Sequence, residues 1–158
     1  MAIVDKNRRI RARKSRSMNI EEQINAYLDS LDEPKQLEMQ TLHQYILSIL
    51  PKTKLWFLDG KDGTGKVVSN PSIGYGHFTI QYKNGSTKEF HQIGISGNTT
   101  GVSVYIMGLE DKKYLPKNFG TRIGKASVTG YCIKFKTLKD INIGILEEAI
   151  QYGARQKE

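Results

Sequence analysis

Apolar residues recur at helical spacing in two segments near the start of the chain. The first segment predicts a helix over residues 19–31, with Asn19 and Glu22 in the positions of a capping box. The second predicts a helix over residues 34–50, which Pro51 stops. The apolar positions that define these helices are Ile20, Ile24, Tyr27, Leu28 and Leu31, then Met39, Leu42, Ile46, Ile49 and Leu50.

Beyond Pro51 the pattern changes to short apolar or alternating runs, which are typical of β-strands. We expect a short irregular helix over residues 111–120 and a last helix that begins after Asn142 and ends before Gly153. This order of elements predicts an α+β fold, in which two N-terminal helices and a C-terminal helix pack on an antiparallel β-sheet. The predicted strands cover residues 55–58, 75–83, 87–95, 102–107 and 131–136.

The Asn84-Gly85 pair predicts a β-hairpin, because a two-residue type I′ turn needs positive φ at both central positions. A two-residue turn places His77 opposite Gln92. One face of the sheet then gathers aromatic and polar side chains suited to a small polar ligand. An ordinary solvated or helix-covered sheet face is the alternative, and a shift of one residue in the register would separate the group. The predicted ligand-binding residues are Tyr75, His77, Phe90, Gln92 and Trp56.

The formal charge of the 158-residue chain is +8 and is unevenly distributed. Residues 1–17 hold seven basic residues and one acidic residue, so this segment carries +6 and the rest of the chain only +2. A polar, like-charged segment disfavours a fixed structure. We therefore predict a basic disordered tail over residues 1–17, one α+β domain over residues 18–153, and a C-terminal tail over residues 154–158.

The basic tail suits contact with nucleic-acid phosphates without sequence preference. It can equally be a solubilising extension, or a segment that is not translated, because Met18 stands one residue before the predicted helix cap. Nucleic acid is therefore a predicted partner only if the tail is genuine. The residues that would make this contact are Arg8, Arg9, Arg11, Arg13, Lys14 and Arg16.

The cysteine content, the apolar stretches and a glycine-rich motif exclude several classes of protein. The single cysteine, Cys132, excludes an internal disulfide and fits a reducing compartment. The sequence has no apolar stretch typical of an export signal or a membrane span, so we expect a cytoplasmic protein without a membrane partner.

Residues 60–66 have the spacing of a phosphate-binding P-loop, but Val67 stands where that motif needs Ser or Thr. We expect a surface loop there and no resident cofactor. The sequence contains no recognisable set of catalytic residues, so a binding module is favoured over an enzyme, which stays the alternative.

Two weaker groups suggest charged ligands. Asp29, Asp32 and Glu33 lie in an acidic helical region, and clustered carboxylates suit hard cations such as iron. The glycine-bounded segment 124–130 could bind an anion through backbone amides and polar side chains. A solvated helix face and an ordinary turn are the respective alternatives. The predicted anion-binding residues are Lys125, Ser127 and Thr129.

Several whole segments resemble the YdhG-like domain family, a bacterial family of small uncharacterised domains, over about residues 18–152. The resemblance implies helices on one side of an antiparallel sheet, and one branch of the family is described as frataxin-like iron chaperones. We predict a non-enzymatic intracellular module that binds a small, unidentified ligand, with iron delivery or nucleic-acid association as alternatives. The segments that carry the resemblance are Trp56, Gly74-Tyr75-Gly76-His77, residues 104–109, residues 124–127 and residues 132–141.

Overall fold

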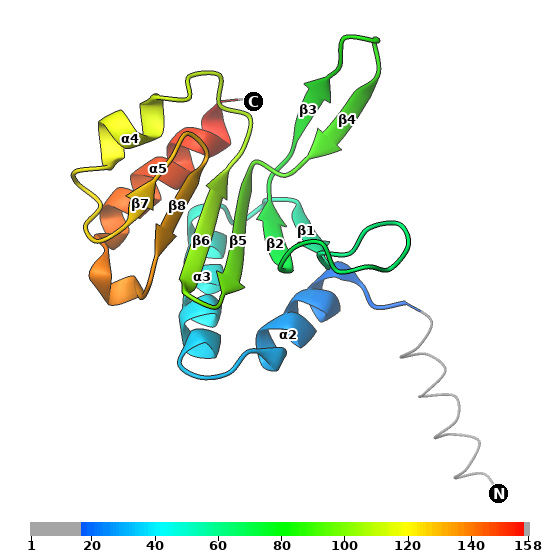
Figure 1. Ribbon diagram of the computed structural model, residues 1–158, viewed down its shortest axis with the longest axis horizontal. Coiled ribbons are helices and arrows are strands. Elements are labelled where there is room, and N and C mark those ends of the chain that lie inside the picture. The colour runs from blue at the N-terminus through cyan, green and yellow to red at the C-terminus, as the bar shows by residue number, and fades with distance from the viewer. Residues whose placement is uncertain (1–16, 157–158) are drawn as a thin grey trace, which may run out of the picture.

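The computed structural model describes residues 17–156, so the tail residues from Arg8 to Arg16 lie outside the described part of the chain. Within it, a six-stranded antiparallel sheet has the strand order β1-β2-β5-β6-β8-β7 (Figure 1). A separate two-stranded ribbon is formed by β3 and β4. The strands are β1 Leu55–Leu58, β2 Ser72–Tyr75, β3 Phe78–Gln81, β4 Thr87–Phe90, β5 Ile93–Asn98, β6 Gly101–Ile106, β7 Ser127–Val128 and β8 Cys132–Phe135.

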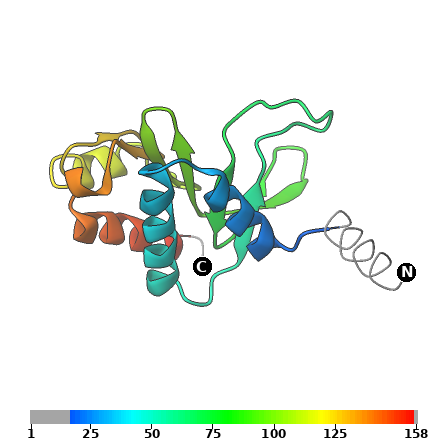
Figure 2. The ribbon, with the colours of Figure 1, turned by 90° about the horizontal axis from the view of Figure 1, so that it is seen from below.

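The helices α2, α3 and α5 cover one face of the six-stranded sheet (Figure 2). The register brings four fully buried aliphatic residues into one row on this face. The predicted α+β class is therefore confirmed. The row consists of Ile73, Ile95, Val104 and Ile133. The helices are α2 Ile20–Ser30, α3 Lys35–Ile49, α4 Tyr114–Phe119 and α5 Ile143–Arg155, and a 3₁₀ turn covers Leu138–Asp140.

Two asparagines cap helices as the sequence predicts. The Asn19 side chain accepts a hydrogen bond from the Glu22 amide at 2.8 Å, and the Asn142 side chain accepts one from the Gly144 amide at 3.0 Å. Each bond satisfies an amide that has no partner inside its helix. Among the described residues, no helix combines the length and the apolar character needed to cross a membrane.

The predicted register of the β3–β4 hairpin is wrong by one residue. The connecting loop has three residues, 83–85, because the Tyr82 amide donates to the Ser86 carbonyl at 2.9 Å. Gly85 has a φ of 86°, whereas no non-glycine residue among those described has positive φ, so Asn84 cannot complete a type I′ turn. A three-residue loop with glycine in the left-handed region forms instead.

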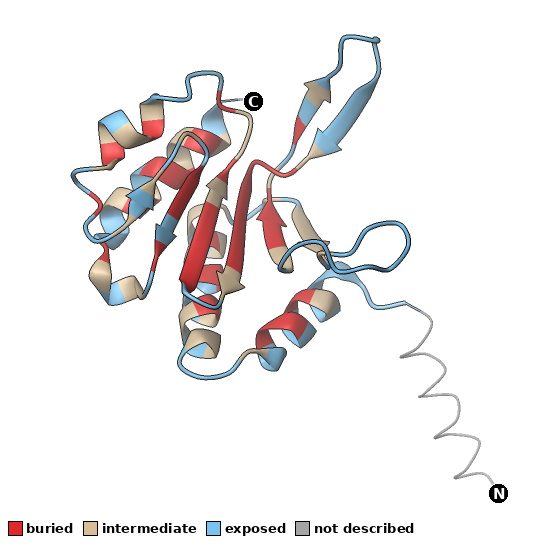
Figure 3. Cartoon of the chain, in the orientation of Figure 1, coloured by how far each residue is buried: buried red, intermediate tan, exposed pale blue. Residues whose placement is uncertain are grey.

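The two long strands predicted around this hairpin are also interrupted, so the ribbon leaves the main sheet (Figure 3). The break lies at Gly76, which has a φ of 75°. Its carbonyl accepts a hydrogen bond from Trp56 Nε1 at 2.7 Å. A Cβ at this position would lie 2.5 Å from Gln92 Oε1, so the turn requires glycine.

The C-terminal helix runs past Gly153, which was expected to end it. Gly153 is buried inside α5, and a Cβ there would lie 2.5 Å from Ile106 Cγ2 and 3.0 Å from Ile93 Cδ1. The glycine therefore lets α5 approach the sheet closely. The segment 124–130, expected as a turn, also contains β7, which pairs antiparallel with β8.

Candidate functional site

The face of the sheet opposite α2, α3 and α5 carries a row of side chains interrupted by two glycines. Trp56, Gly74, Gly94 and Tyr105 lie side by side on β1, β2, β5 and β6. Because strand side chains alternate between faces, this row points away from the buried aliphatic row of the helix-covered face. Two adjacent glycines leave a shallow depression between the two aromatic residues.

The imidazole of His91 fills this depression. A Cβ at Gly74 would lie 2.8 Å from His91 Cγ, and a Cβ at Gly94 would lie 2.9 Å from His91 Cε1. The ring of Phe90 lies 4.3 Å from the imidazole centroid and 6.5 Å from the ring of Trp56. His91 is thus held between the backbone of the sheet and an aromatic cluster, and only 4% of its surface is exposed.

Burial changes the pKa of the His91 imidazole. Desolvation lowers the pKa of the imidazole to about 4, and a smaller backbone effect of Ile93 acts in the opposite direction. Nδ1 has no hydrogen-bond partner at normal distance among the described residues. His91 is therefore neutral at pH 7, and it presents a polar but uncharged ring.

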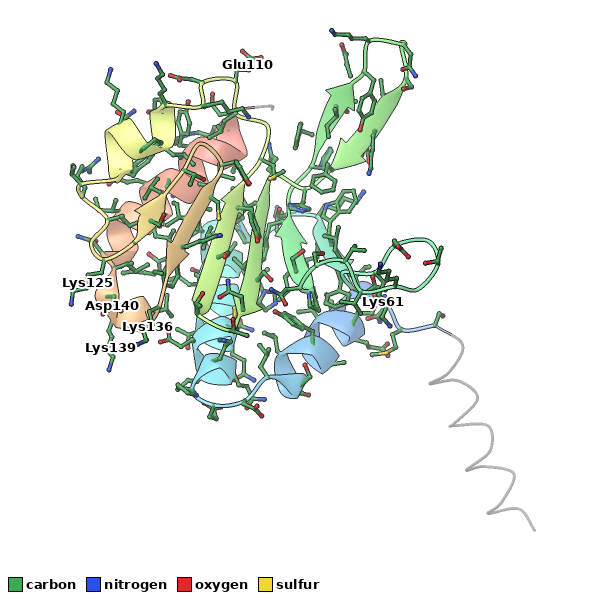
Figure 4. All side chains as sticks on the ribbon, viewed as in Figure 1. Lys61, Glu110, Lys125, Lys136, Lys139 and Asp140 are labelled. Carbon is green, nitrogen blue, oxygen red and sulfur yellow. The ribbon has the colours of Figure 1, made fainter. Side chains whose placement is uncertain are left out.

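A groove of about 730 Å³ lies over this part of the open face. Its floor includes Ser96 and Tyr105 of the sheet, and Phe90 and His91 close one side. The loop between β1 and β2 supplies the opposite wall, where Figure 4 labels Lys61. Volumes of this size hold small molecules, and the lining combines aromatic rings with a few polar groups as ligand sites do.

The structure distributes the five predicted ligand-binding residues over three places. Tyr75 is fully buried on the helix-covered face, where its hydroxyl lies 2.6 Å from His43 Nδ1. His77 and Gln92 line a second cavity of about 670 Å³ beside α5, and the Gln92 amide donates to the Ala154 carbonyl at 3.2 Å. Only Phe90 and Trp56 belong to the aromatic cluster of the open face.

His91, Gly94 and Tyr105 are not among the binding residues predicted from the sequence. The available signal was a pair of glycines inside apolar strand segments, Gly74 and Gly94, since such glycines often mark a close approach to the backbone. The register that aligns these two glycines depends on long-range pairing between β2 and β5.

The residues predicted to bind an anion and those predicted to bind a metal ion lie in different surroundings in the structure. Lys125 and Ser127 line one pocket, whereas the Thr129 hydroxyl accepts a hydrogen bond from the Cys132 amide at 3.2 Å instead. The side chains of Asp29, Asp32 and Glu33 are exposed. Within residues 17–156, no three His, Cys, Asp or Glu side chains gather in a way that could hold a metal ion.

Two other residue groups have structural roles. In the loop with P-loop spacing, the Asp62 carboxylate accepts hydrogen bonds from the Thr64 hydroxyl, and also from the Thr64 and Lys66 amides. These bonds lower its pKa, the hydroxyl contributing most, and no helix begins at Lys66. Cys132 is buried, and desolvation raises the pKa of its thiol despite the nearby charge of Lys134. The thiol therefore stays protonated at neutral pH.

Comparison of the chain with protein-family models, with curated proteins and with solved structures found no match in any of the three. The functional proposal accordingly depends on the fold and on the geometry of the open face.

Proposed function

We propose that this chain is a non-enzymatic binding module whose groove holds a small, planar, uncharged polar molecule such as a nitrogen heterocycle. The observation that carries the proposal is the groove of about 730 Å³, in which the uncharged imidazole of His91 and the ring of Phe90 close one side and Tyr105 forms part of the floor. Grooves of this volume that are lined by aromatic rings and a few polar groups are typical of small-molecule sites.

The lining of the groove determines the class of ligand. Phe90 and Tyr105 offer aromatic surfaces, which favour stacked or tilted contact with another ring. Ser72 and Asn70 add polar groups at the loop side of the groove. The neutral imidazole can exchange hydrogen bonds with a ligand but supplies no positive charge at pH 7. Lys61 and Asp59 of the loop wall carry opposite charges, so the lining has no net charge and favours an uncharged polar ring.

We also infer membership of the YdhG-like domain family. Support comes from the arrangement of α2, α3 and α5 on one face of an antiparallel sheet, which is the architecture that the resemblance implies. This inference gives no ligand, so the groove is argued from its own residues.

Chemical-shift mapping with a panel of heteroaromatic fragments tests the proposed function. We expect at least one fragment to shift the amide signals of His91, Gly94 and Tyr105. Substitution Tyr105→Leu removes an aromatic wall and should weaken binding about five- to tenfold, because an aromatic contact contributes roughly 0.5–1.5 kcal/mol beyond its buried area.

The matched control is Tyr82→Leu, since Tyr82 is exposed on the ribbon and does not line the groove. It should leave the affinity within about twofold. A panel in which fragments bind elsewhere on the protein, and none shifts the groove signals, would refute the proposal.

A further inference from the structure

A second pocket, of about 330 Å³, lies at the β7–β8 end of the sheet. It shares no lining residue with the groove of the open face. Its lining is strongly basic, because three lysines contribute to it, and it includes no Asp or Glu side chain. The residues that matter here are Lys125, Ser127, Lys134, Lys136, Asn98 and Thr100.

Strand pairing explains why these lysines lie together. Ser127 of β7 is directly opposite Lys134 of β8. Lys125 precedes β7 by two residues and Lys136 directly follows the end of β8, so both lysines flank this strand pair and line the same pocket as Ser127 and Lys134. Figure 4 shows Lys125 and Lys136 at the same corner of the molecule.

The positive charge of this pocket is not neutralised by ion pairs in the described part of the chain. The ion pairs found there join Lys54 to Glu89 and Arg122 to Glu148, at a distance from the pocket. Figure 4 labels Lys139 and Asp140 at the same corner of the molecule, so this corner holds one further cation and one carboxylate. Lys125, Lys134 and Lys136 place three like charges around one pocket, and like charges at short separation repel.

We propose that this pocket binds a phosphoryl group of a small phosphorylated compound. An anion with two or more charges relieves the repulsion among Lys125, Lys134 and Lys136, and the ammonium groups supply charge-assisted hydrogen bonds to its oxygens. The Ser127 hydroxyl adds a further donor. The volume of about 330 Å³ accommodates one or two phosphoryl groups.

The test is a titration of the full chain with inorganic pyrophosphate and, separately, with a nucleoside diphosphate, both at constant ionic strength. We expect saturable amide shifts at Ser127, Lys134 and their neighbours. A stronger response to the nucleoside diphosphate would indicate a phosphate ester as ligand, and equal responses would indicate that the phosphoryl groups alone are recognised. Both outcomes support the site.

The double variant Lys134→Gln/Lys136→Gln should weaken pyrophosphate binding about tenfold, which corresponds to roughly 1.4 kcal/mol. The control Lys83→Gln/Lys117→Gln removes the same charge from exposed positions outside the pocket and should change the affinity less than twofold. The cations of residues 1–17 are present in both variants, so their contribution cancels.

Equal weakening in the two double variants would overturn the proposal, because it would show that only the net charge matters. Shifts spread over all basic surfaces without saturation would overturn it as well. The single variant Lys125→Gln gives an independent measurement from the segment before β7, and unchanged affinity in this variant would contradict the shared pocket. Since the two sites share no lining residue, failure of one proposal leaves the other intact.

Discussion

The imidazole of His91 occupies space that two strand glycines leave open. Gly74 has ordinary strand geometry, so its requirement for glycine comes from its neighbours and not from its backbone conformation. A Cβ there would lie 2.8 Å from the Cβ and Cγ atoms of His91 and 2.9 Å from Trp56 Cβ. Those atoms belong to rigidly packed aromatic residues, and they cannot move aside without disturbing the cluster.

Gly74→Ala should therefore lower the free energy of unfolding by about 1–3 kcal/mol, the usual cost of overpacking. Urea denaturation of the wild type and the variant measures this difference. The control is Gly63→Ala, because no atom lies within 4 Å of a Cβ at Gly63. Equal stability of Gly74→Ala and the wild type would show that the imidazole is not packed on this glycine.

Burial of His91 also predicts how stability depends on pH. Its pKa is lowered from 6.5 to about 4 in the folded protein, so the unfolded chain binds the proton more readily. The stabilisation is fully present above pH 6.5 and is lost as the pH falls toward 4. Between pH 7 and pH 4.5 the protein should lose about 2–3 kcal/mol through this group.

His91→Gln removes the titrating ring and should flatten the acid-side loss of stability. The comparison is made by urea denaturation at pH 7 and pH 4.5. His77→Gln serves as the control, because His77 is exposed on the protein surface and should retain the wild-type loss. An identical slope in wild type and His91→Gln would contradict a neutral, buried His91.

At the scale of elements, the close approach of α5 to the sheet depends on Gly153. A Cβ at this position would lie 2.5 Å from Ile106 Cγ2. Gly153→Ala should destabilise the protein by about 1–3 kcal/mol despite the higher helix propensity of alanine. Gly144→Ala, near the start of the same helix, meets only Asn142 Oδ1 at 3.4 Å and should be neutral or slightly stabilising.

Thermal and urea denaturation of these two variants measure the effect of α5 docking. A Gly153→Ala variant that is more stable than the wild type would show that a methyl group fits between α5 and the sheet, contrary to the structure.

The sequence predicted the helices well because their signals are local. Asn19 and Asn142 cap as expected, and the apolar spacing locates α2 and α3 within a few residues. The hairpin register was wrong because the conformation of Asn84 cannot be read from its identity, and a one-residue shift changes every facing pair. The break at Gly76 depends on contacts with Trp56 and Gln92, which are distant in sequence.

The candidate site depends on long-range strand pairing in the same way. The structure brings two of the five predicted residues, Phe90 and Trp56, into one aromatic cluster, whereas Tyr75 faces the helices and contacts His43. His91 was missed because its packing on Gly74 and Gly94 requires the pairing of two strands about twenty residues apart.

At the scale of the whole molecule, the two faces of the sheet differ. The helices α2, α3 and α5 bury the aliphatic row on one face (Figure 2). The groove lies over the opposite face. The basic pocket lies at the β7–β8 end, away from β1 and the loop wall of the groove. This arrangement leaves the open face available for ligands without loss of core packing.

The central claim is that a small polar ring binds beside His91. The most direct measurement follows the ring signals of the His91 imidazole while a fragment that binds the full chain is titrated. The account predicts that these signals and the amide of Tyr105 shift together, with one dissociation constant. Saturable shifts confined to His77 and Gln92, which line the other large cavity, would contradict it.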